Sequence, residues 1–242
     1  MKALTSAFFW IFGGLFFLVV LLFLVPGLIL LGRDRIYPLV RILVRIETFL
    51  MGMPVFVTGK HHIPRERAVI FMGNHESLFD VFVIPAAIPR AFVGVEAAEQ
   101  FSWPIWGWII RKWQNIPIPR ENLAAAKASL EEACKRIEAG ICIGILPEGT
   151  RTLTGEMNDF KKGPFHLALN ASADIVPFAM DGPFRYKSKN SWHLNPTIVR
   201  VKFGPPIRFT SFADKSVEEV RDLVRERILA LKQSLTRREP LA

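Results

Sequence analysis

Residues 68–80 read AVIFMGNHESLFD, and this stretch decides how the rest of the chain is interpreted. The short, continuous apolar run AVIFMG predicts a buried β-strand that ends where polar residues begin. The overlapping segment LFDVFVIPAA, residues 78–87, predicts a short helix directly afterwards. A strand that ends in polar residues and passes into a helix is the repeating unit of α/β folds.

The same alternation continues along the chain. Strands are predicted at PVFVTG, AFVGVE, ICIGILP, IVPFAM and TIVRVKFG, and helices at residues 122–140, 164–173 and 216–235. Ser216 and Glu219 form a capping box at the start of the final helix. This pattern predicts an α/β fold with a largely parallel mixed sheet flanked by helices.

The first 32 residues differ from this pattern, since no charged residue lies between Lys2 and Arg33. A helix of about 30 residues rises roughly 45 Å, more than the roughly 30 Å of a bilayer's hydrocarbon core. Pro26 and Gly27 are expected to break or kink it, so the segment either spans the membrane with a bent end or enters and returns. A secretory signal peptide is the alternative, but the apolar stretch is too long and no small-residue cleavage site follows.

The next segment, residues 34–52, has a wide apolar arc with a narrow polar stripe. This pattern suits a helix in the membrane interface or a helix packed on a core, and periodicity does not separate the two. Arg33, Arg35, Arg41 and Arg45 outnumber Lys2 across the apolar segment, so the positive-inside rule predicts a cytoplasmic catalytic domain, at the inner membrane if the source is a bacterium. The expected division is a membrane-anchoring segment of helices at residues 1–52 and a catalytic domain at residues 53–242.

Composition narrows the class of partner. The 242-residue chain carries a formal charge of +9, which favours anionic partners, and a mean hydropathy of +0.26, which favours membrane lipids over nucleic acid. Cys134 and Cys142 lie in a helical pattern and an apolar strand, so a disulfide framework is not expected. His61 and His62 have no further ligand at a suitable spacing, and no metal or cofactor is predicted.

The polar end of the 68–73 strand predicts a catalytic base. In α/β sheets, chemistry collects at the carboxyl ends of the strands, where Asn74 and His75 are placed. Asp80 is near enough to accept a hydrogen bond from one imidazole nitrogen, which leaves the other nitrogen as a base. No G-x-S-x-G elbow is present, and Ser77 is too close in sequence to be an obvious nucleophile. The base is therefore expected to activate a hydroxyl of the substrate or a water.

Two further stretches supply groups that suit a phosphate. ILPEGTR, residues 145–151, ends another apolar strand with Glu148, Gly149, Thr150 and Arg151 in the turn. Glycine lets backbone amides approach a ligand, threonine offers a hydroxyl, and arginine has a fork suited to phosphate. Arg120, at the end of NIPIPR, is a second candidate phosphate contact. Either arginine taken alone is by default interpreted as a solvated surface charge.

Together these stretches resemble the glycerolipid acyltransferase family, which acylates glycerol-3-phosphate or lysophosphatidic acid. The family's motifs appear in order as NHESLFD, IPIPR, LPEGTR and IVPFAM, within residues 55–210. Leu146 stands where the family commonly has Phe, and Gln114 and Asn115 replace a glycine that often opens the second motif. The family's domain is an α/β fold with an entrance at the membrane.

The resemblance implies an O-acyltransferase of the 1-acylglycerol-3-phosphate type. His75, oriented by Asp80, is implied to remove a proton from a glycerol hydroxyl that attacks a thioester, with no acyl-enzyme. The implied substrate-binding residues are Asn74, Arg120, Glu148, Gly149, Thr150 and Arg151. The acceptor is expected to be lysophosphatidic acid, with glycerol-3-phosphate or another lysophospholipid as alternatives, and the donor acyl-CoA or acyl carrier protein. A lipid hydrolase using the same dyad remains an alternative, and a non-catalytic lipid-binding protein would not need His75 with Asp80.

Overall fold

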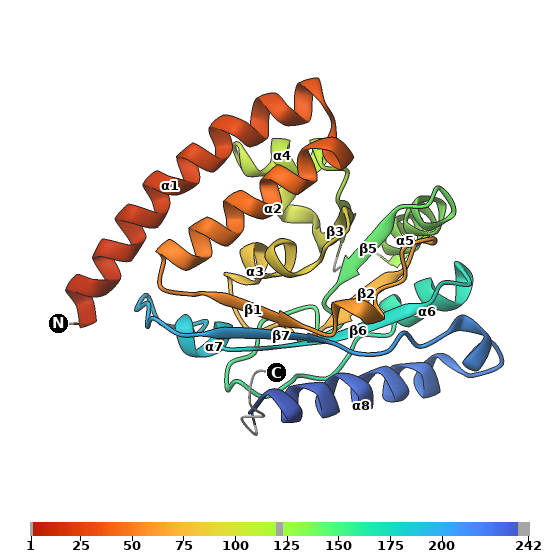
Figure 1. Cartoon of the computed structure of the whole chain (residues 1–242). Coiled ribbons are helices and arrows are strands. Elements are labelled where there is room, and N and C mark those ends of the chain that lie inside the picture. Colours follow the sequence, from red (N-terminus) through yellow and green to blue (C-terminus); the bar gives the residue numbers. More distant parts are fainter. Residues whose placement is uncertain (1, 120–122, 237–242) are drawn as a thin grey trace.

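The fold is described from a computed structural model of the chain, for residues 2–119 and 123–236. After two consecutive N-terminal helices, its described elements alternate largely between strands and helices (Figure 1). The helices are α1 Lys2–Leu30, α2 Arg33–Leu50, α3 Asp80–Ala87, α4 Trp106–Lys112, α5 Leu123–Glu138, α6 Gly163–Asn170, α7 Pro183–Tyr186 and α8 Val217–Thr236. The strands are β1 Val55–Thr58, β2 Ile70–Gly73, β3 Phe92–Ala97, β4 Ile116–Ile118, β5 Cys142–Ile145, β6 Ile175–Asp181 and β7 Val199–Phe203. The sequence pattern predicts this alternation but not α4, β4 or α7.

The described strands form one mixed sheet in the order β1-β7-β6-β2-β5-β3-β4. The five strands from β6 to β4 run parallel to one another, which confirms the predicted largely parallel sheet. β7 pairs antiparallel with β6, and β1 pairs parallel with β7, so these two strands run in the opposite direction. The carboxyl ends of β2, β5 and β6 therefore lie at the same edge of the sheet.

Each face of the sheet is covered by its own apolar core. Because successive side chains of a strand point to opposite faces, Val69 and Phe71 pack beneath α2 and α3, whereas Ile70 and Met72 pack against α5, α6 and α8. Figure 1 shows the resulting three layers, with α2 and α3 on one side of the sheet and α8 on the other. Gly73 ends β2 where a Cβ atom would lie 2.3 Å from the Phe178 ring, so β2 and β6 approach closely just before the site.

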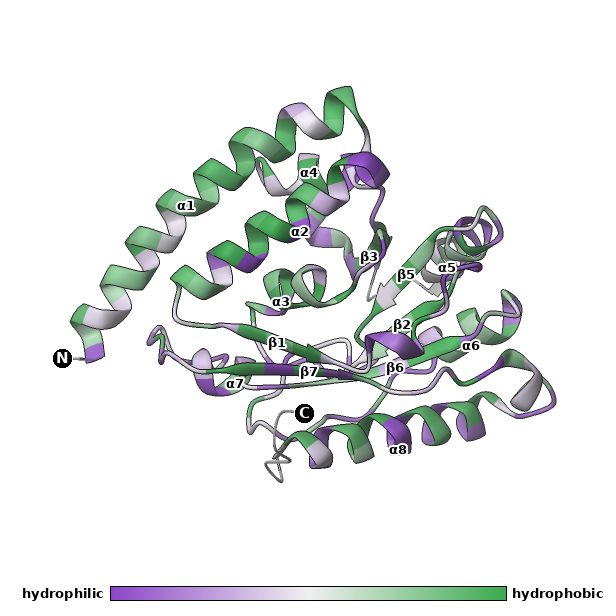
Figure 2. Cartoon of the chain, in the orientation of Figure 1, coloured by the Kyte–Doolittle hydropathy of each residue, from purple (hydrophilic) through white to green (hydrophobic). Residues whose placement is uncertain are grey.

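Helix α1 docks along the rest of the protein through a narrow stripe. Its buried residues include Ser6, Gly13, Val20 and Gly27, which are spaced by seven and so share one face. Figure 2 colours most of α1 as hydrophobic, and Leu4, Leu15 and Leu22 are among its exposed side chains. α1 is, within the described ranges, a helix long and apolar enough to cross a membrane.

The expected break at Pro26 and Gly27 is wrong, because α1 continues through both residues to Leu30. Proline lacks the N–H that would bond the residue four positions earlier, and Pro26 is close enough to the helix end for the last turn to persist. The chain reverses at Gly32 instead, which adopts a φ of 76°. α2 then returns beside α1, with Ile36 so close to Gly27 that a Cβ there would clash at 2.4 Å.

Both interpretations of the second helix have support in its packing. One face of α2 is buried, with Ile36, Tyr37 and Val40 in the core, as in a core-packed helix. The opposite face exposes Leu39, Ile42, Ile46 and Phe49, which are spaced by three or four residues. An exposed apolar stripe of this kind is typical of a helix at a lipid interface.

Candidate active site

The site is built where β2 ends and α3 begins. His75 Nδ1 lies 2.7 Å from Asp80 Oδ2, as expected for a hydrogen bond in which the imidazole N–H donates to the carboxylate. The side chain of Asp80 is 2% exposed and that of His75 is 23% exposed. With Nδ1 engaged by Asp80, Nε2 of His75 is the nitrogen left to accept a proton.

The turn between the two residues wraps around the Asp80 carboxylate. Oδ2 also accepts the backbone N–H groups of Glu76 at 2.8 Å and Ser77 at 3.1 Å. Three donors therefore converge on one oxygen of a buried carboxylate. This arrangement fixes both the carboxylate and the imidazole that it orients.

The LPEGTR turn after β5 holds the backbone of His75 from the other side. Glu148 Oε1 accepts the His75 N–H at 2.7 Å, and Glu148 Oε2 accepts the Asn158 N–H at 2.8 Å. The backbone N–H of Thr152 donates to the His75 carbonyl at 3.0 Å. Burial raises the pKa of Glu148, and the two backbone N–H groups oppose that rise. The carboxylate of Glu148 thus holds the backbone at His75 against the backbone at Asn158.

Asn74 holds the end of β2 against β6. Its Oδ1 accepts the Met180 N–H at 2.7 Å, and its Nδ2 donates to the Met180 carbonyl at 2.9 Å. The same Nδ2 donates to Glu76 Oε1 at 3.0 Å. Asn74 is 1% exposed, so its amide is engaged within the protein.

The remaining predicted residues are divided between the site edge and a segment outside the described residues. Gly149 and Thr150 are exposed beside the dyad, and Gly149 adopts a φ of 67°, a conformation that glycine accepts without strain. Arg151 follows them and is partly exposed. Arg120 lies outside the described residues.

Several residues of the site were not predicted from the sequence. Glu76 is buried and pairs with Lys232 of α8 at 2.9 Å, which ties the catalytic turn to the last helix. Ser77 is 1% exposed, and its hydroxyl donates to the Lys187 carbonyl at 2.8 Å, so it does not face a substrate. Lys189 donates from Nζ to Thr150 Oγ1 at 3.2 Å. Their partners are 39 to 156 positions away in sequence, so no local pattern could have identified these contacts.

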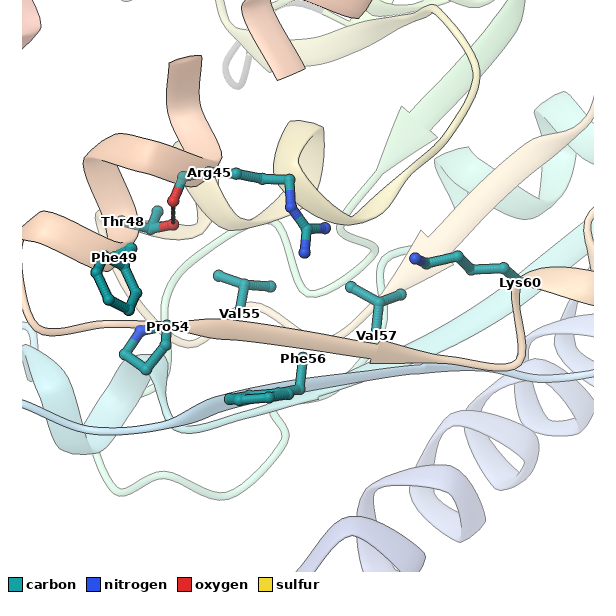
Figure 3. A pocket seen from close by; sticks show the side chains of 8 residues that line it. All are labelled: Arg45, Thr48, Phe49, Pro54, Val55, Phe56, Val57 and Lys60. Carbon is teal, nitrogen blue, oxygen red and sulfur yellow. Dashed lines mark hydrogen bonds between the residues drawn. The ribbon is translucent and has the colours of Figure 1, made fainter. Parts of the chain in front are cut away.

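A separate pocket of about 390 Å³ lies over the edge strand β1, and His75 does not line it (Figure 3). Its lining residues are Arg45, Thr48, Phe49, Pro54, Val55, Phe56, Val57 and Lys60. The side chains of Arg45 and Lys60 extend toward each other over Val57 (Figure 3). No cluster of three or more metal-ligating side chains occurs in the described part of the chain.

A family model described as Acyltransferase matches residues 54–181, which include the dyad and the LPEGTR turn. The 1-acyl-sn-glycerol-3-phosphate acyltransferase of Limnanthes alba is 33% identical over 178 residues, which are 73% of this chain and 62% of the relative. The chain therefore spans less than two thirds of that relative's length. The protein of the same name from Borreliella burgdorferi is 28% identical over 193 residues, which are 79% of this chain and 76% of the relative.

A solved structure has the same fold. The crystal structure of the 1-acyl-sn-glycerophosphate (LPA) acyltransferase PlsC from Thermotoga maritima superimposes with a TM-score of 0.82 at 23% identity. The match covers 99% of this chain and 98% of that chain, so it includes both N-terminal helices.

Proposed function

This chain belongs to the Acyltransferase family, and from that premise we propose that it transfers a fatty acyl group from a thioester to the free hydroxyl of lysophosphatidic acid. The product is phosphatidic acid, a precursor in phospholipid biosynthesis. The observation that carries the proposal is the 2.7 Å contact between His75 Nδ1 and the buried Asp80 carboxylate at the end of β2. The names of the similar proteins support lysophosphatidic acid as the acceptor.

The proposed reaction is a single acyl transfer. His75 Nε2 accepts the proton of the glycerol hydroxyl while that oxygen attacks the thioester carbonyl. The carbon–sulfur bond then breaks, and the imidazolium returns its proton to the departing thiolate. Asp80 keeps Nδ1 protonated and stabilises the imidazolium that forms between these steps.

The proposed transfer forms no covalent acyl-enzyme intermediate. Ser77 is buried with its hydroxyl donated to a carbonyl, and Cys142 is buried in β5. Burial also raises the pKa of the Cys142 thiol, which disfavours the nucleophilic thiolate. These observations support direct attack by the acceptor hydroxyl.

We further propose that residues 1–52 attach the protein to a membrane and that residues 53–242 form the catalytic domain on the cytoplasmic side, at the inner membrane in a bacterium. The apolar outer surface of α1 and the exposed stripe of α2 support this attachment. Acceptor and product are lipids, so a site at the membrane surface shortens their path. Arg151 and Arg120 are the proposed contacts for the acceptor phosphate, beside Gly149 and Thr150. The donor is acyl-CoA or acyl carrier protein.

The test is transfer of a labelled acyl group to lysophosphatidic acid in liposomes, with acyl-CoA and acyl carrier protein supplied separately. Labelled phosphatidic acid is expected with the parent protein and not with His75→Ala. His166→Ala is the matched control, because His166 is exposed on α6 and has no part in the site. Release of free fatty acid as the sole product would identify a hydrolase instead. Product only with glycerol-3-phosphate or another lysolipid would overturn the assigned acceptor.

A further inference from the structure

The loop after α7 lies against both motif turns of the site. The Lys187 carbonyl accepts the Ser77 hydroxyl of the first turn at 2.8 Å, and Lys189 Nζ reaches Thr150 Oγ1 of the second turn at 3.2 Å. Both lysines lie beyond residues 54–181, the part that the family model matches. The loop therefore adds side chains to the site that the shared motifs do not contain.

Lys187 lies near enough to Arg151 for the two positive charges to repel each other, and Lys189 reaches Thr150, the residue before Arg151. Among the described residues, no carboxylate lies within ion-pair distance of Lys187, Lys189 or Arg151. The nearby acids are already engaged: Asp181 pairs with Arg185 at 2.6 Å, and Glu76 pairs with Lys232 at 2.9 Å. The cluster thus has a surplus of positive charge at the edge of the catalytic turn.

Lys187 is a buried member of this group of positive charges. Lys187 is 8% exposed, and its ammonium donates to the Ser188 carbonyl at 3.0 Å, which leaves further N–H groups to be satisfied. Burial and the positive charge of Arg151 both lower the pKa of Lys187. A buried cation beside a second cation is unfavourable, and a bound anion would relieve the repulsion and keep the ammonium charged. Cations without a paired carboxylate at the edge of the site are suited to bind an anionic ligand.

We propose that Lys187 and Lys189 complete, with Arg151, a three-cation site for the phosphomonoester dianion of the acceptor. This inference rests on the proposed function, because it assigns the acceptor side of that same site. Arginine offers a planar fork, the two ammonium groups supply point charges, and Thr150 adds a hydroxyl, a set that suits a dianionic tetrahedral group. The same three cations could also bind the phosphates of a coenzyme A donor. Measuring the KM of acceptor and donor separately distinguishes these two ligands.

The experiment compares Lys187→Met, Lys189→Met and the double variant with the parent protein. We expect the KM for lysophosphatidic acid to rise about tenfold for each lysine, as for loss of a charged hydrogen bond, while the KM for acyl-CoA changes less than about twofold. Lys187→Arg keeps the charge and is expected to retain most of the affinity. Lys215→Met, an exposed lysine before α8, is the matched control. Thermal unfolding of each variant separates lost binding from lost folding.

Two further readouts distinguish failure of this inference from failure of the proposed function. Calorimetric binding of lysophosphatidic acid in detergent, without donor, does not depend on turnover. If the parent binds it and the double variant does not, the site stands even when no acyl transfer occurs. If the parent acylates lysophosphatidic acid and the lysine variants keep their acceptor KM, or if the donor KM rises instead, the proposed site is overturned.

Discussion

Asp80→Asn is the sharpest perturbation of the proposed chemistry, because it removes one charge and keeps the shape of the side chain. An asparagine oxygen at the Oδ2 position can still accept the N–H groups of His75, Glu76 and Ser77, so the turn is expected to remain folded. The lost contribution is the attraction between the carboxylate and the imidazolium that forms during proton transfer.

The 2.7 Å contact between His75 Nδ1 and Asp80 Oδ2 sets the size of this effect. It places the centres of the two charges about 4 Å apart, and unit charges at that distance interact by about 4 kcal/mol at an effective dielectric constant of about 20. Loss of this attraction only in the transition state lowers the rate by about a thousandfold.

The assay is acyl transfer to lysophosphatidic acid in liposomes, with turnover measured at saturating substrates and folding followed by thermal unfolding. Asp174→Asn is the matched control, because Asp174 is 3% exposed and pairs with Arg67 and Arg208 at the opposite end of β6. That control is expected to lose stability and keep its turnover while folded. A folded Asp80→Asn protein that retains more than about a tenth of the parent's turnover would refute the assigned role of Asp80.

Three other substitutions test the backbone contacts of Glu148, the buried carboxyl group of Glu47 and the backbone conformation of Gly59. Glu148→Gln cannot accept both backbone N–H groups and is expected to lower turnover by about tenfold to a hundredfold; equal turnover to the exposed Glu156→Gln control would contradict this. Burial raises the pKa of Glu47 to about 8 from 4.5, so the folded chain retains a proton that the unfolded chain releases, and stability falls as pH rises between these values. In Glu47→Gln, the fall in unfolding free energy between pH 5 and pH 8.5 should be smaller by a few kcal/mol than in the parent. An equal fall in parent and variant would contradict this role of Glu47. Gly59→Ala would place a Cβ 2.1 Å from the Phe203 carbonyl oxygen at a φ of 74° and should cost about 2 kcal/mol or more of unfolding free energy, unlike the unobstructed Gly163→Ala.

All strands of the described sheet except β4, and the dyad, could be predicted from the sequence because they depend on local information. Apolar runs and their polar ends locate the strands, and a separation of five positions brings the His75 imidazole and the Asp80 carboxylate together. The capping box was also predictable, and Ser216 and Glu219 make the expected mutual hydrogen bonds. Each of these features depends on residues that are close together in the sequence.

The unpredicted features depend on where distant segments return. Asn74 bonds Met180, 106 positions later, and Glu76 meets a lysine of the last helix. Lys187 and Lys189 reach Ser77 and Thr150 only because the chain returns to the site after α7. The continuation of α1 through Pro26 was also not predicted, because the local tendency of proline to end a helix has little effect so close to the helix end at Leu30.

The position of β1 has a consequence for the order in which the protein assembles during synthesis. β1 pairs with β7, so Thr58 leaves the ribosome about 140 residues before Val199 arrives. At about 5 to 20 residues per second, this strand waits roughly 7 to 28 s for its partner. α1 is complete before that interval begins, and a membrane that holds it would keep the waiting strand away from other nascent chains. Arrested chains ending before residue 199 should therefore expose β1 to protease, and chains extended past α8 should protect it.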